Sequence, residues 1–163
     1  MERDLASEME RRSRRGKPFC LVLAHIDDYE KWSASISVNK RQLVARHIAK
    51  LISKCIRSFD DAYRIGDGEF IMALKQSETA GGLAAIKRLR TFMSQYPIAI
   101  DGVPAISMSF CTAEPTPGDD LGELITHMQG DLGHHDDERG NASVEYLEQS
   151  PLERFIKTIE ADS

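Results

Sequence analysis

Hydrophobic positions along the chain occur in two patterns, short continuous runs and longer segments with helical spacing. The run from Phe19 to Ile26 is almost entirely apolar, which is typical of a central strand covered on both faces. Apolar residues recur every three or four positions over Asn39–Phe59 and over Ser77–Tyr96. This spacing predicts two amphipathic helices that each pack one face on a sheet, with Phe59 on the inner face of the first and Ser77 as N-cap of the second.

Weaker patterns predict the remaining elements. Helices are expected over Asp4–Arg15, Leu121–Leu132 and Pro151–Ile159, an edge strand over Val144–Leu147, a loop over Gly133–Asn141, and a small hairpin in which Ile98–Ile100 and Val103–Thr112 flank the turn Asp101-Gly102. Strands that alternate with helices and hairpins predict an α/β (α+β mixed) fold. We expect a central mixed sheet of about five strands, covered by helices on both faces, plus the small hairpin.

The segment between the two long helices contains a strong hairpin signal. Apolar residues flank the sequence Gly66-Asp67-Gly68 on both sides. An Asp-Gly turn fits such a connection because it requires positive φ, which glycine adopts freely. By itself the pattern predicts a hairpin and no function.

Length and composition limit the class of protein. A chain of 163 residues can bury one full core, so we expect one domain over residues 18–148, with a helix and linker over 1–17 and a helix and tail over 149–163. No apolar run approaches the roughly 20 residues that span a bilayer, and the N-terminal residues lack the order of a signal peptide. We therefore expect a cytoplasmic chain, cut from a longer protein, with no membrane insertion in this segment. Three widely spaced cysteines among apolar neighbours predict reduced core thiols.

Charge is unevenly distributed along the chain. Residues 31–90 contain 12 basic and 5 acidic residues, a balance of +7, and residues 119–163 contain 3 basic and 12 acidic residues, a balance of −9. A basic middle suits a phosphate-bearing ligand, and an acidic tail suits solubility or a basic partner. On charge alone, two ordinary solvated faces are the simpler interpretation. We expect no nucleic-acid polymer as a partner.

The hairpin carries a resemblance to a known family. Residues 64–70 read R-I-G-D-G-E-F, which resembles the signature hairpin of the GGDEF domain, the catalytic fold of bacterial diguanylate cyclases. Gly66, Glu69 and Phe70 match the signature. Asp67 and Gly68 replace its second and third letters, so the signature reads GDGEF and is degenerate. The resemblance extends from about residue 5 to residue 147 and is strongest between residues 57 and 74.

The altered letters bear on metal binding. The resemblance implies that Mg²⁺ would be held by the first Asp of a D-x-D motif and by the acidic third letter, positions that here contain His25 and Gly68. Neither residue supplies the anionic oxygen that a hard cation needs. We therefore expect no catalytic residue, no magnesium and no cofactor. Asp27 and Glu69 remain as an alternative pair that would hold one ion in a shifted site.

Other positions that the family uses for substrate also differ. Glu30 stands where the resemblance implies a phosphate-binding lysine, and Ser33 and Gln42 stand where it implies the Asn and Asp that read guanine. Asp67 would place a carboxylate near a triphosphate that lacks a screening metal, which lowers affinity. These changes agree with a loss of cyclase activity.

A second family site matches. Arg57-Ser-Phe-Asp60 has the type and offset of the R-x-x-D inhibitory site, at which many GGDEF domains bind cyclic di-GMP. Arg88 stands twenty residues after the third signature letter, where the family often places an arginine that completes this site. A guanidinium can bond phosphate or guanine in bidentate fashion, and a carboxylate can accept from guanine N1–H and N2–H₂. The plainer interpretation is that Arg57 caps a helix and Arg88 is solvated surface.

The sequence therefore predicts a catalytically inactive GGDEF domain that acts as a cyclic di-GMP receptor through Arg57, Asp60 and Arg88. The resemblance implies a bacterial second-messenger role, such as regulation of biofilm or motility. Output would pass to a protein partner or through a homodimer, with the basic run Arg11–Arg15 as a candidate donor to a neighbouring subunit. Two alternatives stay open: a ligand-free interaction or dimerisation module, and a residual cyclase. A metal site at residues 134–137 (His-His-Asp-Asp) has no diagnostic spacing.

Overall fold

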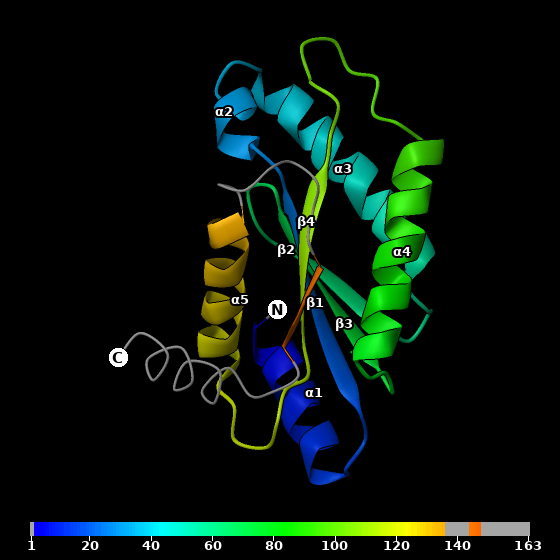
Figure 1. Cartoon of the computed structure of the whole chain (residues 1–163), viewed down its shortest axis with the longest axis vertical. Coiled ribbons are helices and arrows are strands. Elements are labelled where there is room, and N and C mark those ends of the chain that lie inside the picture. Colours follow the sequence, from blue (N-terminus) through cyan, green and yellow to red (C-terminus); the bar gives the residue numbers. More distant parts are fainter. Residues whose placement is uncertain (1, 136–143, 148–163) are drawn as a thin grey trace.

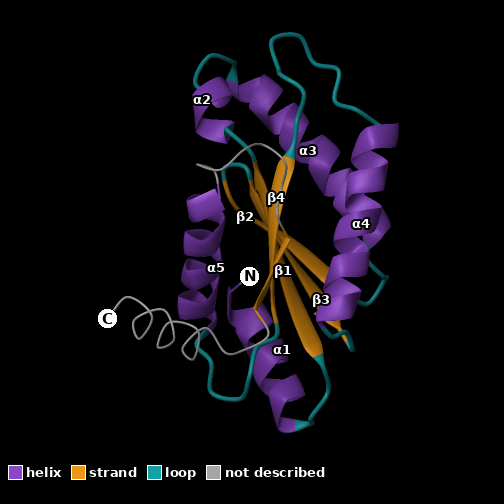
Figure 2. Cartoon of the chain, in the orientation of Figure 1, coloured by secondary structure: helices purple, strands orange, loops and turns teal. Residues whose placement is uncertain are grey.

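The computed structural model describes residues 2–135 and 144–147. Its elements are α1 (Glu2–Arg14), β1 (Phe19–Ile26), α2 (Tyr29–Ser33), α3 (Val38–Cys55), β2 (Asp61–Gly66), β3 (Glu69–Lys75), α4 (Thr79–Gln95), β4 (Met108–Ala113), α5 (Leu121–His135) and β5 (Val144–Leu147). Figure 1 follows the chain through these elements, and Figure 2 separates helices from strands.

The sheet has five strands in the order β2-β3-β1-β4-β5. Strand β1 lies at its centre and pairs antiparallel with β3 and β4, and β2 pairs antiparallel with β3. Strand β5 pairs parallel with β4 at the edge. The mixed sheet, the central position of the apolar run and the edge strand after residue 143 are as the sequence predicted.

Helices cover both faces of the sheet, which confirms the predicted architecture (Figure 1). The even-numbered residues of β1 from Cys20 to Ile26 join a core with α3 and α4. The odd-numbered residues from Phe19 to Leu23 join a second core with α1 and α5. This division follows from the alternation of side chains along a strand. The three cysteines are buried free thiols, as predicted.

Helix α3 ends earlier than its apolar spacing predicted. The last helical residue is Cys55, Ile56 is extended (φ −101°, ψ 161°), and Phe59 is 46% exposed instead of lying in the core. The reason is local: the Asp60 carboxylate accepts the backbone N–H of Arg57, at 2.9 Å. Such a side-chain-to-backbone bond competes with the helix and folds residues 57–60 into a turn.

The start of α4 also differs from the prediction. Helix α4 begins at Thr79 with Glu78 at the N-cap position, so Ser77 is not the cap. The Glu114 carboxylate, which follows β4, accepts from both the backbone N–H and the hydroxyl of Thr79. A residue distant in sequence therefore supplies the cap, which the local sequence does not reveal.

The predicted small hairpin between residues 98 and 112 does not form. Residues 98–107 contain no strand, and β4 begins only at Met108. The apolar side chains of this segment pack against the core beneath α3 and α4; they are Ile98, Ile100, Val103 and Ile106. Lys40 of α3 donates from Nζ to the backbone oxygen of Asp101 at 2.6 Å, so the turn is bound to a helix and not paired as a hairpin.

Helix α5 reaches His135, so residues 133–135 are helical where the sequence predicted a loop. The rest of that loop, the closing helix over Pro151–Ile159 and the side chains of the proposed metal site at residues 134–137 lie outside the described residues. The division at residues 17 and 148 and the cytoplasmic location stay predictions. Within the described part of the chain, every helix is too short or too polar to cross a bilayer.

Candidate functional site

The degenerate hairpin joins β2 to β3 and is closed by Gly68, which has φ +75°. A Cβ atom at this position would lie 2.8 Å from Cγ of Tyr29, because the ring of Tyr29 packs directly against the glycine. Tyr29 is buried at the start of α2. The structure thus fills with an aromatic ring the space into which an acidic third letter would extend.

His25 and Glu69 face each other on neighbouring strands, where they are paired in register. His25 Nδ1 lies 3.6 Å from Glu69 Oε1, and Glu69 Oε2 accepts a hydrogen bond of 2.7 Å from Gln129 of α5. The polar contact with His25, followed by the hydrogen bond from Gln129, holds the pKa of Glu69 below its ordinary value, against the opposing effect of burial. The pair joins the hairpin to β1 and α5.

Asp27, the other carboxylate left for a shifted ion, is bound to the start of β4. Its Oδ2 accepts from the Ser107 hydroxyl and its Oδ1 from the Ser109 hydroxyl, both at 2.6 Å. Sequence reasoning did not find these serines, because they lie about eighty residues from Asp27 and only the fold brings them there.

These contacts do not fit a hard divalent cation. Asp27 accepts from two serine hydroxyls, Glu69 from Gln129 beside His25, and Gly68 offers no side chain. Within residues 2–135 and 144–147, no group of three or more His, Cys, Asp or Glu side chains converges as a metal site would require.

Arg64 links the hairpin to α3, a role that the sequence analysis missed. Its Nη1 donates to Gln42 Oε1 at 2.9 Å, its Nη2 to Asp67 Oδ1 at 3.0 Å, and its Nε to the backbone oxygen of Gly66 at 3.2 Å. One guanidinium therefore joins Asp67, the altered second letter of the signature, to Gln42, which stands at the altered guanine-reading position. This network lies at one end of a groove of about 400 Å³ between α3 and β2.

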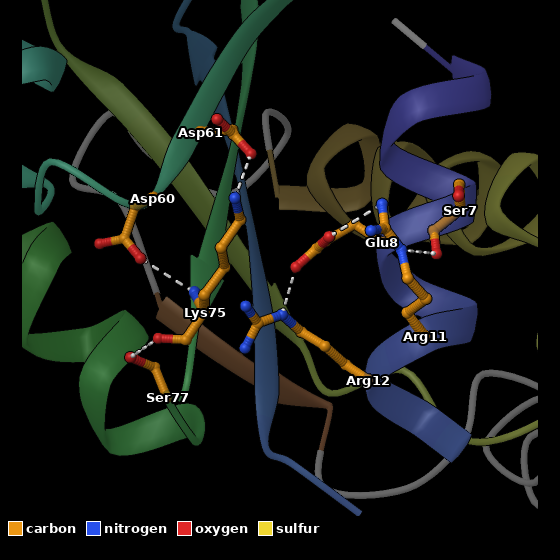
Figure 3. Close-up of polar contacts among 8 residues, drawn as sticks. All are labelled: Ser7, Glu8, Arg11, Arg12, Asp60, Asp61, Lys75 and Ser77. Atoms are coloured by element: carbon orange, nitrogen blue, oxygen red, sulfur yellow. Dashed lines mark hydrogen bonds and ion pairs between the residues drawn. The ribbon is translucent and has the colours of Figure 1, made fainter. Parts of the chain in front are cut away.

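The R-x-x-D segment is a turn held by Asp60. Its Oδ2 accepts from the backbone N–H of Arg57 and its Oδ1 from that of Lys75, both at 2.9 Å. Figure 3 shows the second contact, with Lys75 also paired through Nζ to Asp61 at 2.8 Å. The carboxylate is half-buried, and a carboxylate has about four acceptor positions, so two bonds leave it able to accept more.

The two arginines predicted for this site lie at the same end of α3. The guanidinium of Arg57 is exposed and lies over the ring of Phe59, with Cζ 5.7 Å from the ring centroid. Arg88 of α4 donates from Nε and Nη2 to the backbone oxygen of Cys55, at 3.0 and 2.7 Å. Cys55 precedes Arg57 by two residues, so the structure brings together the elements that carry Arg57, Asp60 and Arg88.

The basic run of α1 is partly committed to its own helix. Glu8 accepts from Arg12 Nε at 2.6 Å and lies 3.4 Å from Arg11 Nη2 (Figure 3). The hydrogen bond from Arg12 lowers the pKa of Glu8. Arg15 is exposed beyond the end of the helix. Of the predicted donors to a neighbouring subunit, Arg11 and Arg12 are therefore the less available.

The mixed sheet with the signature hairpin, covered by helices on both faces, is the fold predicted for a GGDEF domain. The profile described as "Diguanylate cyclase, GGDEF domain" matches residues 1–141. The chain therefore belongs to the GGDEF domain family. It is 27% identical over 82 residues to diguanylate cyclase A of Treponema denticola. That match covers 50% of this chain and 22% of the relative, so it spans about a fifth of the relative's length.

Solved structures share the fold. The GGDEF domain of DgcB from Caulobacter crescentus, crystallised in complex with c-di-GMP, superposes with a TM-score of 0.72 at 18% identity and covers 88% of this chain and 89% of that one. Diguanylate cyclase SiaD from Pseudomonas aeruginosa, solved with its activator SiaC, gives 0.74 at 18% identity, covering 88% of this chain and 56% of that one. At these identities the likeness establishes the fold alone.

Proposed function

We propose that this chain is a catalytically inactive GGDEF domain that binds cyclic di-GMP through Arg57, Asp60 and Arg88 and passes the signal to a protein partner or through a homodimer. The observation that carries the proposal is the arrangement at the end of α3. The turn of residues 57–60 is fixed by the Asp60 carboxylate, and Arg88 is held against Cys55 beside it.

The chemistry of this end of α3 suits a dinucleotide. Arg57 has its backbone fixed and its guanidinium exposed, so it can approach a phosphate or a guanine edge without reorganising the turn. Two bonds to Cys55 use two of the five N–H groups of Arg88. Phe59 adds an exposed aromatic ring on which a base could stack. The c-di-GMP complex of the DgcB GGDEF domain, which shares the fold, supports the choice of ligand.

The hairpin supports the absence of catalysis and of bound magnesium. The ring of Tyr29 occupies the space beside Gly68, and His25 is paired with Glu69. Asp27, the remaining carboxylate, is bound by two serines. Joining two GTP molecules requires charge neutralisation on the triphosphate, and this set of side chains does not supply it.

Titration calorimetry with cyclic di-GMP tests the binding proposal. Wild-type protein should give saturable heat at tens of micromolar ligand, and Arg57→Ala should weaken binding by about tenfold or more, the effect of losing a charge-assisted contact. Lys87→Ala is the matched control, because Lys87 is exposed on α4 beside Arg88 and outside the site. The absence of heat with wild type, or equal affinity in Arg57→Ala, would end the proposal.

A separate assay tests inactivity. Protein incubated with GTP and either Mg²⁺ or Mn²⁺ should form no cyclic di-GMP above a buffer control. Turnover in the wild type that disappears in Glu69→Gln would show that a residual metal site works, and the chain would then be a cyclase.

A further inference from the structure

The layer formed by α3 and α4 differs in charge from the rest of the molecule. Helix α3 carries five Lys or Arg residues and α4 carries three, and neither helix contains an Asp or Glu. The two helices pack side by side on one face of the sheet (Figure 1). Every charged side chain that these two helices can present to a partner is therefore a cation.

The same layer holds the exposed apolar side chains. Among the residues that the structure describes, the large hydrophobic side chains that are exposed are Val38, Leu43, Phe59 and Tyr96, at 58%, 47%, 46% and 50%. Two lie on α3, one follows α3 and one follows α4. All four belong to α3, α4 or the residues that directly follow them, and none belongs to the described side chains of α1 or α5.

Leu43, His47, Lys50 and Lys54 recur at helical spacing and form an outward row on α3, which we call the basic stripe. Tyr96 joins the stripe from the end of α4. Its backbone oxygen lies 2.8 Å from His47 Nε2, and its ring lies 4.9 Å from Lys54 Nζ. The stripe is therefore one continuous surface from two helices.

A cavity of about 160 Å³, lined by residues with apolar side chains, opens beside Tyr96. Its lining comes from α3, from the end of α4 and from the loop before β4, and includes Ile48, Leu51, Met93, Ile98 and Ile106. Tyr96, Pro97 and Ala105, which complete the wall, are exposed, so the cavity communicates with solvent. A cavity of about 150 Å³ with apolar walls holds a benzene molecule, so this one can take a Leu, Ile or Phe side chain.

We propose that the basic stripe and this cavity form a docking site for an acidic peptide segment of a partner protein. One bulky apolar side chain of the segment enters the cavity, and its carboxylates pair with Lys50 and Lys54. A buried apolar anchor with a charged rim is the arrangement that concentrates binding energy in protein interfaces. A membrane surface fits less well, because a bilayer has no side chain to enter a recessed cavity.

Selection of random peptides displayed on phage, with the full chain as bait, tests the proposal. Enriched peptides should carry several Asp or Glu residues around one Leu, Ile, Phe or Trp. In fluorescence polarisation with the most enriched synthetic peptide, replacing its apolar anchor by Ala should weaken binding by about tenfold or more. Added salt should weaken it as well, because exposed charges are screened.

Three protein variants locate the site. Lys50→Glu/Lys54→Glu should weaken the peptide by about tenfold or more by charge reversal, and Ala105→Leu should do the same by filling the mouth of the cavity. Arg15→Glu/Lys17→Glu makes the same change in net charge beyond the end of α1 and should leave affinity within about twofold. Circular dichroism confirms that each variant is folded.

Several outcomes would overturn the proposal. They are a selection without enrichment, enriched peptides that lack acidic residues, equal affinity for all three variants, and vesicles of anionic phospholipid that bind the stripe and displace the peptide. Cyclic di-GMP binding should be unchanged in Lys50→Glu/Lys54→Glu. The docking site and the dinucleotide site can therefore fail independently.

Discussion

Replacing Asp60 tests whether this residue builds the turn that presents Arg57. Asp60→Ala removes both acceptors and leaves the exposed N–H of Arg57 and the half-buried N–H of Lys75 without their partner. Leaving a buried donor unsatisfied costs about 1–3 kcal/mol, and water recovers most of this at the exposed donor. We expect a loss of about 2 kcal/mol in the free energy of unfolding. Asp60→Asn keeps one acceptor and should lose about half as much.

Urea denaturation without ligand measures these changes, provided that the slope of the transition is unchanged. Arg57→Ala is the matched control, because it keeps the backbone N–H and removes only an exposed side chain. It should alter stability by less than about 0.5 kcal/mol. The reasoning fails if Asp60→Ala unfolds within that margin of wild type, or if Arg57→Ala is destabilised as strongly. If the expected stabilities are found, a change in ligand affinity in an Arg57 variant can be assigned to the lost contact with ligand. A change in affinity in an Asp60 variant would combine the lost contact with the loss of the folded turn.

Three further predictions follow from buried contacts. Gly68→Ala should cost about 2–4 kcal/mol of stability in denaturant unfolding, because its Cβ would approach the ring of Tyr29 to 2.8 Å at positive φ, and wild-type stability would refute this packing. The lowered pKa of Glu69 stabilises the fold above the ordinary glutamate pKa of about 4.3 and ceases to do so as the pH falls through the lowered value. Glu69→Gln should therefore flatten the loss of stability between about pH 5 and pH 3, and an unchanged profile would count against the pairing. Burial raises the pKa of Cys20 to about 12 and that of Cys55 to about 11, so a disulfide reagent should label neither thiol at neutral pH until urea unfolds the chain, and rapid labelling of the native protein would contradict their burial.

Elements whose signal is local were predictable from the sequence. The apolar run Phe19–Ile26 gave the central strand, because only a doubly covered strand tolerates so few polar residues. The Asp-Gly pair predicted the β2–β3 hairpin, because the turn needs a residue that adopts positive φ and Gly68 alone meets this need. The helix expected from residue 4 is α1, and Leu5 and Met9, four residues apart, are buried on one side of it.

Features set by specific side-chain contacts were not predictable. The end of α3 depends on Asp60, which breaks a helical pattern that runs on to Phe59. The loop that replaces the small hairpin depends on the core beneath α3 and α4, and the α4 cap depends on Glu114. The loop and the cap arise between segments tens of residues apart, whereas spacing describes neighbours along the chain. The end of α3 is set by a contact three residues away, but a side-chain bond to the backbone leaves no mark on the apolar spacing.

The candidate site divides in the same way. Motif offsets placed Arg57, Asp60 and Arg88 near one another, and the structure brings their elements together at the end of α3. The packing of the Tyr29 ring against Gly68 could not be predicted from the sequence. The sequence shows that the acidic third letter is absent, but not which side chain occupies the space it would have filled. The bridge from Arg64 to Gln42 was equally hidden, although an arginine two residues before the signature glycine is a visible cue.

A crystal structure grown with cyclic di-GMP, GTP and Mg²⁺ together is the most direct test of the central claim, which separates a retained dinucleotide site from a lost metal site. We expect cyclic di-GMP against Arg57, Asp60 and Arg88, with Tyr29 still packed on Gly68 and no magnesium beside it. Electron density for Mg²⁺–GTP at the hairpin, or an empty site at the end of α3 under saturating ligand, would contradict it.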